Sequence, residues 1–423
     1  MGLLRLNSRI LMLILLVTTL GSPSLYPKNP GEPVLQVRLF YLIQLKKLIF
    51  QGQDHPFQMV IRDIAKGETL FRKLKEIEIR IRSNQSIIIS DMDKIIYRGD
   101  WKSIEIYSPV GEPLLVGNRI IAPRPYDGRF LIQPYKTPKG HGVHCINLVA
   151  INSYLKSVVS AEMAGITGSI ESLKAQGVAS RSYALTSLDR HKAEGYQFCD
   201  TTHCQVYLGK KNIRPHVSQA VDQTRNEIIL FGEIPITAYY HSTCGGQTTT
   251  PTRTWGSTNQ AYLAGVKDRD TNSQDYCFNS PHYRWKAKVE KEIIHSAFLR
   301  NRPFRDSLKI SRILYDPSGR VLKMVLSSGQ YSKSVSGEVF RIVMGRIIGW
   351  NKIKSSAFDI ISEDSDSFYF RGKGLGHGVG LCQYGTAKMG ELGFSYKEIL
   401  KHYFPNTRIN ELHKRFQGNN KLK

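Results

Sequence analysis

The chain has 423 residues and a formal net charge of +24, because 59 Lys and Arg residues outnumber 35 Asp and Glu. Hydrophobic residues make up 41% of it, which permits a sizeable core and excludes global disorder. The positive charge favours an anionic partner. The basic residues are spread along the chain and no zinc-finger, homeodomain or RRM signature is present, so we do not expect nucleic acid as the partner.

Residues 1–25 have the pattern of a secretory signal peptide or an N-terminal anchor. Arg5 and Arg9 precede an apolar run of eleven residues, 10–20, and small residues follow it. The run is shorter than the roughly 20 residues that a membrane-spanning helix needs. We therefore expect an exported protein, periplasmic or extracytoplasmic, with anchoring to the inner membrane through this uncleaved segment as the alternative.

Residues 26–135 form an expected β-rich N-terminal module. Short runs with alternating or β-branched residues recur there and are separated by Gly and Pro. The runs are 37–43, 77–82, 86–90, 102–107 and 130–134. No motif that carries chemistry stands out in this module.

Helical patterns follow in residues 150–190. Ser153 is placed to cap a helix over 154–163, and Ser169 to cap a second over about 170–192. Glu162 lies near the end of the first helix among apolar neighbours, which would raise the pKa of its carboxyl and suit it to general acid catalysis. The alternative for Glu162 is an exposed helical glutamate that reaches into water.

Lys174 and Arg181 lie seven residues apart in the second expected helix. They therefore project from nearly the same side of it, two turns apart. Two aligned cations beside an apolar face are well placed to meet an anionic ligand. The alternative is a basic stripe that faces solvent.

Cys199, His203 and Cys204 form a candidate metal site. Two thiolates and an imidazole within six residues can ligate structural Zn²⁺, with His191 or a water as the fourth ligand. The spacing is not that of a standard zinc finger, so a local disulfide or two reduced buried cysteines remain alternatives.

Residues 235–375 return to β patterns, with a helix expected near 290–300. His241 and Ser242 lie in a polar loop with paired glycines that can line a groove, and Trp255 beyond it can stack on a sugar. A serine hydrolase is not expected, because no G-x-S-x-G elbow surrounds Ser242.

Residues 372–385 hold six glycines in fourteen positions, together with His377, Gln383 and Tyr384. We interpret them as a tight, ligand-facing loop between a strand and a helix. The spacing fits neither G-x-G-x-x-G nor G-x-x-x-x-G-K-[ST], so no nucleotide cofactor is expected. Helices over 385–391 and 396–403 follow, and residues 413–423 form a basic tail.

Taken in order, these motifs resemble the stage II sporulation protein D (SpoIID) family, whose members include amidase-enhancer proteins of the LytB type. The similar segments are 154–163, 171–184, 199–207, 241–248, 335–341 and 372–385. On this basis residues 136–412 make a SpoIID-like catalytic domain. The implied fold is α+β, with a helical catalytic core flanked by β-rich subdomains that form a substrate groove. Ala164 and Cys382 stand where many relatives have Pro and Ser.

The resemblance implies a peptidoglycan lytic transglycosylase, which cleaves the MurNAc-β-1,4-GlcNAc bond and leaves a 1,6-anhydro end. Glu162 corresponds to the family's catalytic acid/base, and the zinc site to Cys199, His203 and Cys204, with His191 as fourth ligand. The residues expected to contact substrate are Lys174, Arg181, His241, Ser242, His377, Gln383 and Tyr384.

The implied partners are glycan strands stripped of stem peptides, a cell-wall amidase, and the division or sporulation machinery. One alternative is a non-catalytic glycan-binding module that enhances a cell-wall amidase. Another is a zinc amidase centred on Cys199 and His203.

Overall fold

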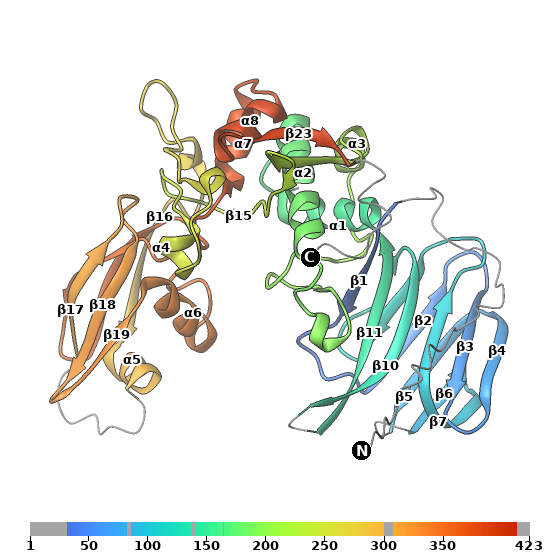
Figure 1. Cartoon of the computed structure of the whole chain (residues 1–423). Coiled ribbons are helices and arrows are strands. Elements are labelled where there is room, and N and C mark those ends of the chain that lie inside the picture. The colour runs from blue at the N-terminus through green and yellow to red at the C-terminus, as the bar shows by residue number, and fades with distance from the viewer. Residues whose placement is uncertain (1–31, 83–85, 138–139, 164, 300–307, 413–423) are drawn as a thin grey trace, which may run out of the picture.

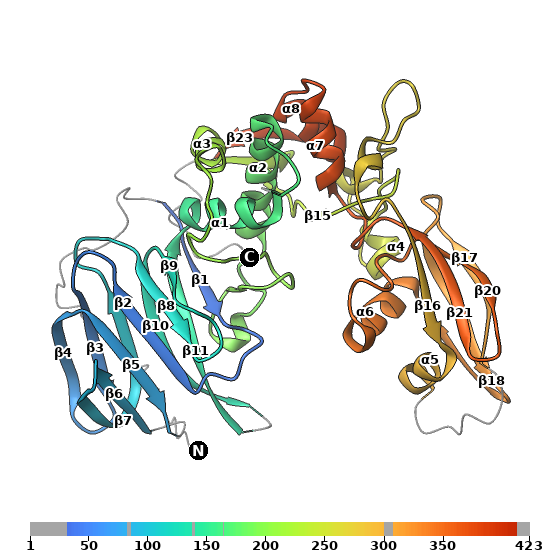
Figure 2. The same ribbon diagram turned by 180° about the vertical axis from the view of Figure 1, so that it is seen from behind.

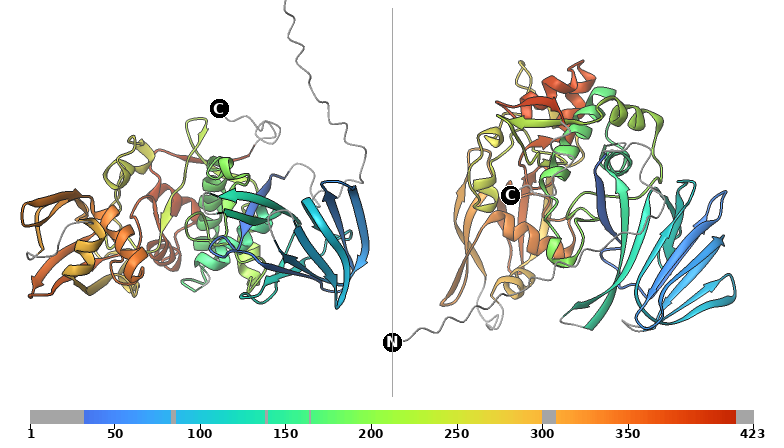
Figure 3. Two further views of the ribbon diagram at one scale, coloured as in Figure 1. Left: turned by 90° about the horizontal axis from the view of Figure 1, so that it is seen from below. Right: turned by 45° about the vertical axis from the view of Figure 1, so that its right-hand side comes forward.

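The computed structural model describes residues 32–82, 86–137, 140–163, 165–299 and 308–412. The expected signal or anchor, 1–25, and the basic tail, 413–423, lie outside the described residues. In those that are described, no helix has the length and apolar character needed to cross a membrane. The fold is α+β, as predicted: a large curved sheet lies at one end, smaller sheets at the other, and helices lie between them (Figures 1 and 3).

The large sheet contains twelve strands in the described part of the chain. They are β1 (Val34–Leu39), β2 (Lys47–Gly52), β3 (Phe57–Asp63), β4 (Gly67–Leu74), β5 (Glu76–Ile81), β6 (Ser86–Asp91), β7 (Lys94–Tyr107), β8 (Leu114–Asn118), β9 (Arg124–Tyr126), β10 (Arg129–Thr137), β11 (Gly140–Ala150) and β12 (Phe198–Cys199). The first half of β7 pairs with β6 and its second half pairs with β3 and β10, so this long strand joins the two parts of the sheet.

The expected boundary between residues 135 and 136 falls inside β10. This strand pairs with β11 from Arg129 opposite Leu148 to Thr137 opposite Gly140, and β11 pairs in turn with β1. The β structure of the N-terminal region is confirmed, but the sheet continues into the SpoIID-like region through β11 and β12. The boundary predicted at 135 is misplaced because β10 and β11 pair as a hairpin across it, and the change of composition near 135 does not indicate that pairing.

Three helices pack against one end of this sheet. They are α1 (Ile151–Met163), α2 (Ile170–Thr186) and α3 (Pro215–Gln223), and the short 3₁₀ turn η1 (Lys192–Glu194) follows α2. Ser169 caps α2 as predicted, because its hydroxyl accepts the Ser172 N–H at 3.5 Å. Helix α1 starts earlier than expected since it continues directly from β11, and α2 ends six residues before the expected 192.

The β-rich region at the other end of the molecule carries two three-stranded sheets (Figure 2). Its elements are β16 (Arg284–Glu290), α5 (Lys291–Phe298), β17 (Lys309–Tyr315), β18 (Val321–Ser328), β19 (Tyr331–Val335), α6 (Gly337–Ile348), β20 (Phe358–Glu363) and β21 (Ser367–Lys373). They share one hydrophobic core around Trp285, Phe340 and Phe370. Helix α5 confirms the helix expected near 290–300, whereas α6 was not predicted.

Short elements connect the two ends. They are β13 (Glu227–Phe231), β14 (Ile234–Pro235), β15 (Tyr240–His241), α4 (Pro251–Trp255), η2 (Ala261–Leu263), η3 (Tyr276–Asn279), β22 (Leu381–Cys382), α7 (Gln383–Glu391), α8 (Tyr396–Tyr403) and β23 (Arg408–Glu411). Strands β15 and β22 pair in parallel, Tyr240 opposite Leu381 and His241 opposite Cys382. This pairing joins the polar loop to the glycine-rich loop and places Gln383 at the first residue of α7, beside α1 and α2.

Candidate active site and metal centre

Glu162, in the last turn of α1, is the point at which three distant segments meet. The Gln383 side-chain Nε2 donates to Glu162 Oε2 at 3.2 Å, and the backbone N–H of Val206 donates to Oε1 at 3.3 Å. Gln383 is itself buried, with 3% of its surface exposed. The two candidate residues Glu162 and Gln383, which lie 221 residues apart, are therefore brought into direct contact.

The surroundings of Glu162 favour the protonated carboxyl. Burial raises its pKa, and the hydrogen bonds from Gln383 and Val206 oppose this effect because they stabilise the carboxylate. Among the described residues Glu162 forms no ion pair that would hold it charged. A carboxyl with a raised pKa and two donors on its anionic form is suited to give up a proton and take it back.

A row of hydrogen-bonded side chains, which the sequence did not indicate, lies next to Val206. The hydroxyl of Tyr154 donates to Gln205 Oε1 at 3.1 Å, and Gln205 Nε2 donates to the Tyr240 hydroxyl at 3.0 Å. Gln205 is 1% exposed. Burial raises the pKa of Tyr240, and the charge of Glu162 raises it further. The only sequence signal for Gln205 is its position directly after Cys204.

Aromatic rings gather where the polar loop and the glycine-rich loop meet. The ring centroid of His377 lies 5.2 Å from Trp255 and 5.5 Å from His241, and Tyr239 lies 4.9 Å from Trp255. Trp255 keeps 40% of its surface exposed. Burial lowers the pKa of His377 to about 4 and lowers that of His241 as well, so both imidazoles are neutral near pH 7.

Ser242 and Tyr384 lie beside each other at the β15–β22 pair. The Tyr384 backbone N–H donates to the Ser242 carbonyl at 3.1 Å, and the Ser242 hydroxyl lies 3.2 Å from that of Thr243. Both side chains are half-buried. Of the expected substrate residues, five therefore lie in or next to the β15–β22 pair and the glycine-rich loop that leads into α7: His241, Ser242, His377, Gln383 and Tyr384.

Arg181 does not form the ligand-facing row expected with Lys174. It is 1% exposed, and its guanidinium donates to the Glu227 carbonyl at 3.1 Å and to Asn152 Oδ1 at 3.2 Å. Burial lowers its pKa to about 10, which still leaves it charged near pH 7. Lys174 forms an ion pair with Glu171 at 2.7 Å. The periodicity of α2 could not reveal this difference, because other helices and β13 enclose α2 on the side of Arg181.

The glycine-rich loop packs closely on protein atoms at Gly374 and Gly378, which both have a positive φ. Gly378 has φ +81°, and a Cβ there would lie 2.3 Å from the Arg320 guanidinium carbon. Gly374 has φ +79°, and a Cβ there would lie 2.4 Å from the Thr243 carbonyl oxygen. Protein atoms therefore fill the Cβ direction at both positions, which accounts for the need for glycine there.

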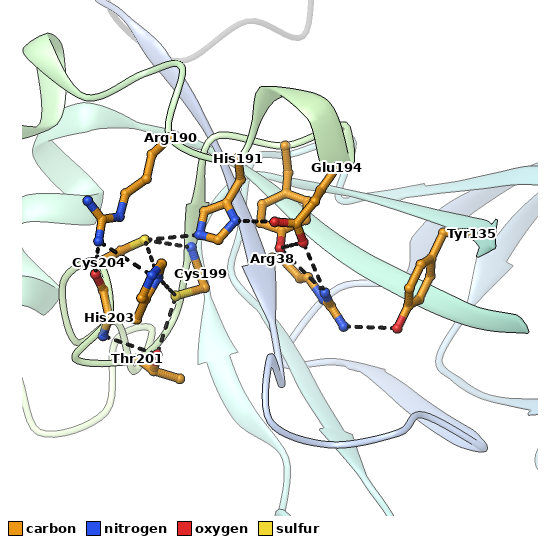
Figure 4. Close-up of polar contacts among 10 residues, drawn as sticks. Arg38, Tyr135, Arg190, His191, Glu194, Cys199, Thr201, His203 and Cys204 are labelled. Atoms are coloured by element: carbon orange, nitrogen blue, oxygen red, sulfur yellow. Dashed lines mark hydrogen bonds and ion pairs between the residues drawn. The ribbon is translucent and has the colours of Figure 1, made fainter. Parts of the chain in front are cut away.

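His191, Cys199, His203 and Cys204 come together as one cluster, with ligand atoms all within 4.8 Å of one another (Figure 4). Cys204 Sγ lies 3.4 Å from His191 Nε2 and 3.7 Å from His203 Nδ1, and Cys199 Sγ lies 3.7 Å from the same His203 nitrogen. Glu194 Oε1 lies 2.7 Å from His191 Nδ1, which turns Nε2 toward the sulfurs.

The donor set of this cluster fits zinc. Two thiolates and two imidazoles are a tetrahedral Zn²⁺ set, and a carboxylate on the far nitrogen of a ligating histidine is its usual support. Four protein ligands leave no open position, which is typical of a structural site. Cys204 is followed directly by Gln205 and Val206, so the same loop carries the N–H that reaches Glu162.

Residues 139–231 match the family model of the stage II sporulation protein, SpoIID, and residues 269–380 match a domain of unknown function, DUF8618. An uncharacterized protein of Brachyspira hyodysenteriae is 29% identical over 299 residues, covering 69% of this chain and 75% of the relative. Stage II sporulation protein D of Bacillus subtilis is 25% identical over 283 residues, covering 62% and 75%.

The amidase enhancer of Bacillus subtilis is 31% identical over 293 residues, covering 60% of this chain but only 40% of that relative. The SpoIID match spans Glu162, Val206 and all four residues of the metal cluster. The aligned stretches of the three relatives are each about three times as long as the SpoIID match itself. Residues 139–231 of the chain are therefore a region of the stage II sporulation protein D (SpoIID) family.

Proposed function

We propose that the protein is an exported peptidoglycan lytic transglycosylase that cleaves the MurNAc-β-1,4-GlcNAc bond with Glu162 as its single acid/base. The observation that carries the proposal is the half-buried Glu162 carboxyl, with its raised pKa, between Gln383 Nε2 and the Val206 N–H. Membership of a family that includes such enzymes supports the same assignment.

Glu162 gives up one proton in the reaction and then takes a second one back. Protonated Glu162 gives its proton to the glycosidic oxygen while the bond from that oxygen to the muramyl anomeric carbon breaks. The muramyl 6-hydroxyl oxygen then attacks the anomeric carbon, and the Glu162 carboxylate accepts the hydroxyl proton. The product has a 1,6-anhydro ring, no water is consumed and the enzyme regains its starting form. A single carboxyl suffices, whereas hydrolysing glycosidases use a pair.

Gln383 and Val206 stabilise the intermediate carboxylate of Glu162. Each donates a hydrogen bond to a different carboxylate oxygen, which fixes the orientation of the group as well as its charge. Without these donors, burial alone would hold the proton too firmly for the carboxyl to release it. The zinc bound by the His191, Cys199, His203 and Cys204 cluster would be structural and would hold the loop that supplies the Val206 N–H.

The proposed substrate is a glycan strand from which an amidase has removed the stem peptides. Each muramyl unit of such a strand carries a free lactyl carboxylate, so the strand is polyanionic and suits a chain of net charge +24. The exposed face of Trp255, beside Tyr239 and His377, offers a surface on which a sugar ring can stack.

The test is product analysis on purified stripped strands. Wild-type protein is expected to give anhydro-muramyl ends by mass spectrometry, and Glu162→Gln, which keeps the shape of the side chain, is expected to give none. Glu233→Gln is the matched control, because the Glu233 side chain is 86% exposed and pairs only with Arg408 among the described residues. Full activity of Glu162→Gln would contradict the proposal.

The second candidate is a non-catalytic module that binds glycan and enhances a cell-wall amidase. The 31% identity to the amidase enhancer of Bacillus subtilis favours this candidate. It predicts that Glu162→Gln stimulates a partner amidase on intact cell walls as well as the wild type does, and that no anhydro ends form with either protein.

A further inference from the structure

A second cluster of ligating side chains lies directly behind Gln383. Its four members are Cys244, Asp268, Cys277 and Cys382, and their ligand atoms all lie within 4.8 Å of one another. None of these side chains is more than 1% exposed. We propose that they bind one Zn²⁺ as a closed structural site, separate from the cluster of His191, Cys199, His203 and Cys204.

The distances within this second cluster suit a single tetrahedral ion. Zn–S bonds of about 2.3 Å at tetrahedral angles separate two sulfurs by about 3.8 Å, and a sulfur from a carboxylate oxygen by about 3.5 Å. Cys244 Sγ lies 3.5 Å from Cys277 Sγ and 3.0 Å from Asp268 Oδ2. Small side-chain rotations away from a central ion would bring both separations to those values.

Backbone N–H groups donate hydrogen bonds to the sulfurs of Cys244 and Cys382, as they commonly do to metal-bound thiolates. Cys244 Sγ accepts the Gly246 N–H at 3.2 Å, and Cys382 Sγ accepts the N–H groups of Cys244 at 3.3 Å and Gly385 at 3.4 Å. Gly246 has φ +113°, a conformation that favours glycine and that aims its N–H back at Cys244. Donors of this kind stabilise the anionic sulfur that a metal requires.

The carboxylate of Asp268 accepts a hydrogen bond from a tyrosine, but among the described residues it forms no ion pair with a Lys or Arg. Its Oδ1 accepts the Tyr403 hydroxyl at 2.5 Å, while Oδ2 faces Cys244. Among the described residues its one ion-pair contact is with His402, at 3.9 Å, and no Lys or Arg reaches it. A buried carboxylate beside three thiols calls for a compensating cation, and sulfur-rich sites select zinc over harder metals.

A disulfide between Cys244 and Cys277 is the competing arrangement, since an exported protein meets oxidising conditions. It would use two of the three thiols. Cys382 and Asp268 would then remain buried beside it, with the amide of Gly385 and the hydroxyl of Tyr403 still pointing at them. Zinc accounts for all four groups, whereas the disulfide accounts for two.

The second site joins four segments of the chain. Cys244 follows β15, Asp268 lies in the loop before η3, Cys277 is within η3, and Cys382 ends β22. Cys382 is followed at once by Gln383, the donor to Glu162. An ion bound here would therefore fix the position of that donor from the side opposite the first cluster.

The test counts zinc per chain by elemental mass spectrometry of the full protein, produced with zinc present and without chelator. We expect Cys277→Ser to carry one zinc fewer than the wild type. The double variant Cys199→Ser/Cys204→Ser should also lose one, and when loaded with Co²⁺ should still show sulfur-to-cobalt charge-transfer absorption. Cys145→Ala is the matched control, because Cys145 is equally buried but belongs to neither cluster, and it should keep the wild-type count.

The proposal is overturned if Cys277→Ser keeps the wild-type zinc count, or if non-reducing peptide mapping of the wild type finds Cys244 bonded to Cys277. If Cys277→Ser does not fold, X-ray absorption of the zinc-loaded Cys199→Ser/Cys204→Ser protein decides: three sulfur ligands per zinc support the site and two or fewer contradict it. None of these readouts depends on glycan cleavage, so the site can fail without the proposed function failing, and the reverse.

Discussion

At Glu162, two opposed effects set the protonation state of the carboxyl. Burial raises its pKa and the Gln383 and Val206 hydrogen bonds lower it. A raised pKa means that the protonated acid persists to higher pH and that activity is lost as pH rises through that value. Because burial is the larger effect, the carboxyl of this proposed acid stays protonated to higher pH than that of an exposed glutamate.

Gln383→Leu removes one donor to the carboxylate and should raise the pKa of Glu162 further. The alkaline limb of the rate profile should move to higher pH by about 0.5 to 1 unit, since a hydrogen bond to the charged form contributes about 1 kcal/mol. The measurement is anhydro-product formation against pH. Gln51→Leu, in the large sheet, should leave the limb in place. If the alkaline limb of Gln383→Leu stays in place or moves to lower pH, the contact from Gln383 does not lower the pKa of Glu162.

Arg181→Met should weaken folding and not ligand binding, because the buried guanidinium joins α2 to α1 and β13. The loss should be about 2 to 4 kcal/mol in the free energy of unfolding, since Asn152 and the Glu227 carbonyl lose their donor. Lys174→Met should cost about 1 kcal/mol or less. Urea unfolding measures both. Equal stability of the two variants, with glycan affinity lost only in Arg181→Met, would restore a ligand-contacting role.

At the scale of elements, the glycine-rich loop is held by close packing as well as by its backbone conformation. Gly378→Ala should therefore cost more than the about 1 to 2 kcal/mol of a left-handed alanine, because its Cβ meets Arg320. Gly67→Ala is the matched control: Gly67 has φ +80° with open space around its Cβ position. Thermal unfolding of the two variants measures the difference. Equal costs would mean that Arg320 moves aside freely.

The sequence predicted those helices whose caps and hydrophobic spacing lie within the helix itself. The Ser169 cap marks the start of α2 and the run 396–403 marks α8, and both agree with the structure. Helix α6 was missed because its own residues include Gly337 and several β-branched ones, so that the Ser336 cap and packing on β18 define it. The end of α2 was overestimated because residues 187–191 turn away to bring His191 to the metal cluster.

The part of the candidate site that could be predicted is the part whose ligating side chains lie close together in the sequence. His191, Cys199, His203 and Cys204 lie close in sequence, and their grouping agrees with the structure. The second cluster was not predicted, because Cys244 lies 33 residues from Cys277 and 138 from Cys382. The Gln205 network was missed for the same physical reason, since only tertiary pairing brings Tyr154 and Tyr240 to it.

At the scale of the whole molecule, the large sheet contains strands from both the N-terminal region and the SpoIID-like region. Strand β1 lies between β11 and β12, so it fastens the segment that carries Cys199 to the strand that leads into α1. A chain that begins at residue 136 would lose β1 and most of β10 and expose the buried faces of β11 and α1. We expect it to aggregate or to lack cooperative unfolding, measured by size-exclusion chromatography and thermal melting.

The control for that truncation removes only residues 1–25, the expected signal or anchor, and keeps every strand that the structure describes. This shorter chain should remain monodisperse and unfold at the temperature of the full-length protein. If the chain beginning at residue 136 behaves in the same way, the N-terminal strands are an independent module and the boundary predicted from composition is the functional one.

The central claim is that Glu162 gives its proton to the departing glycosidic oxygen and then takes the proton of the attacking 6-hydroxyl, with no water consumed. The most direct measurement is cleavage of stripped strands in water enriched in heavy oxygen, followed by mass spectrometry of the new ends. The account predicts anhydro ends that carry no heavy oxygen, formed by the wild type and absent with Glu162→Gln. New reducing ends that carry one heavy oxygen would show hydrolysis and contradict it.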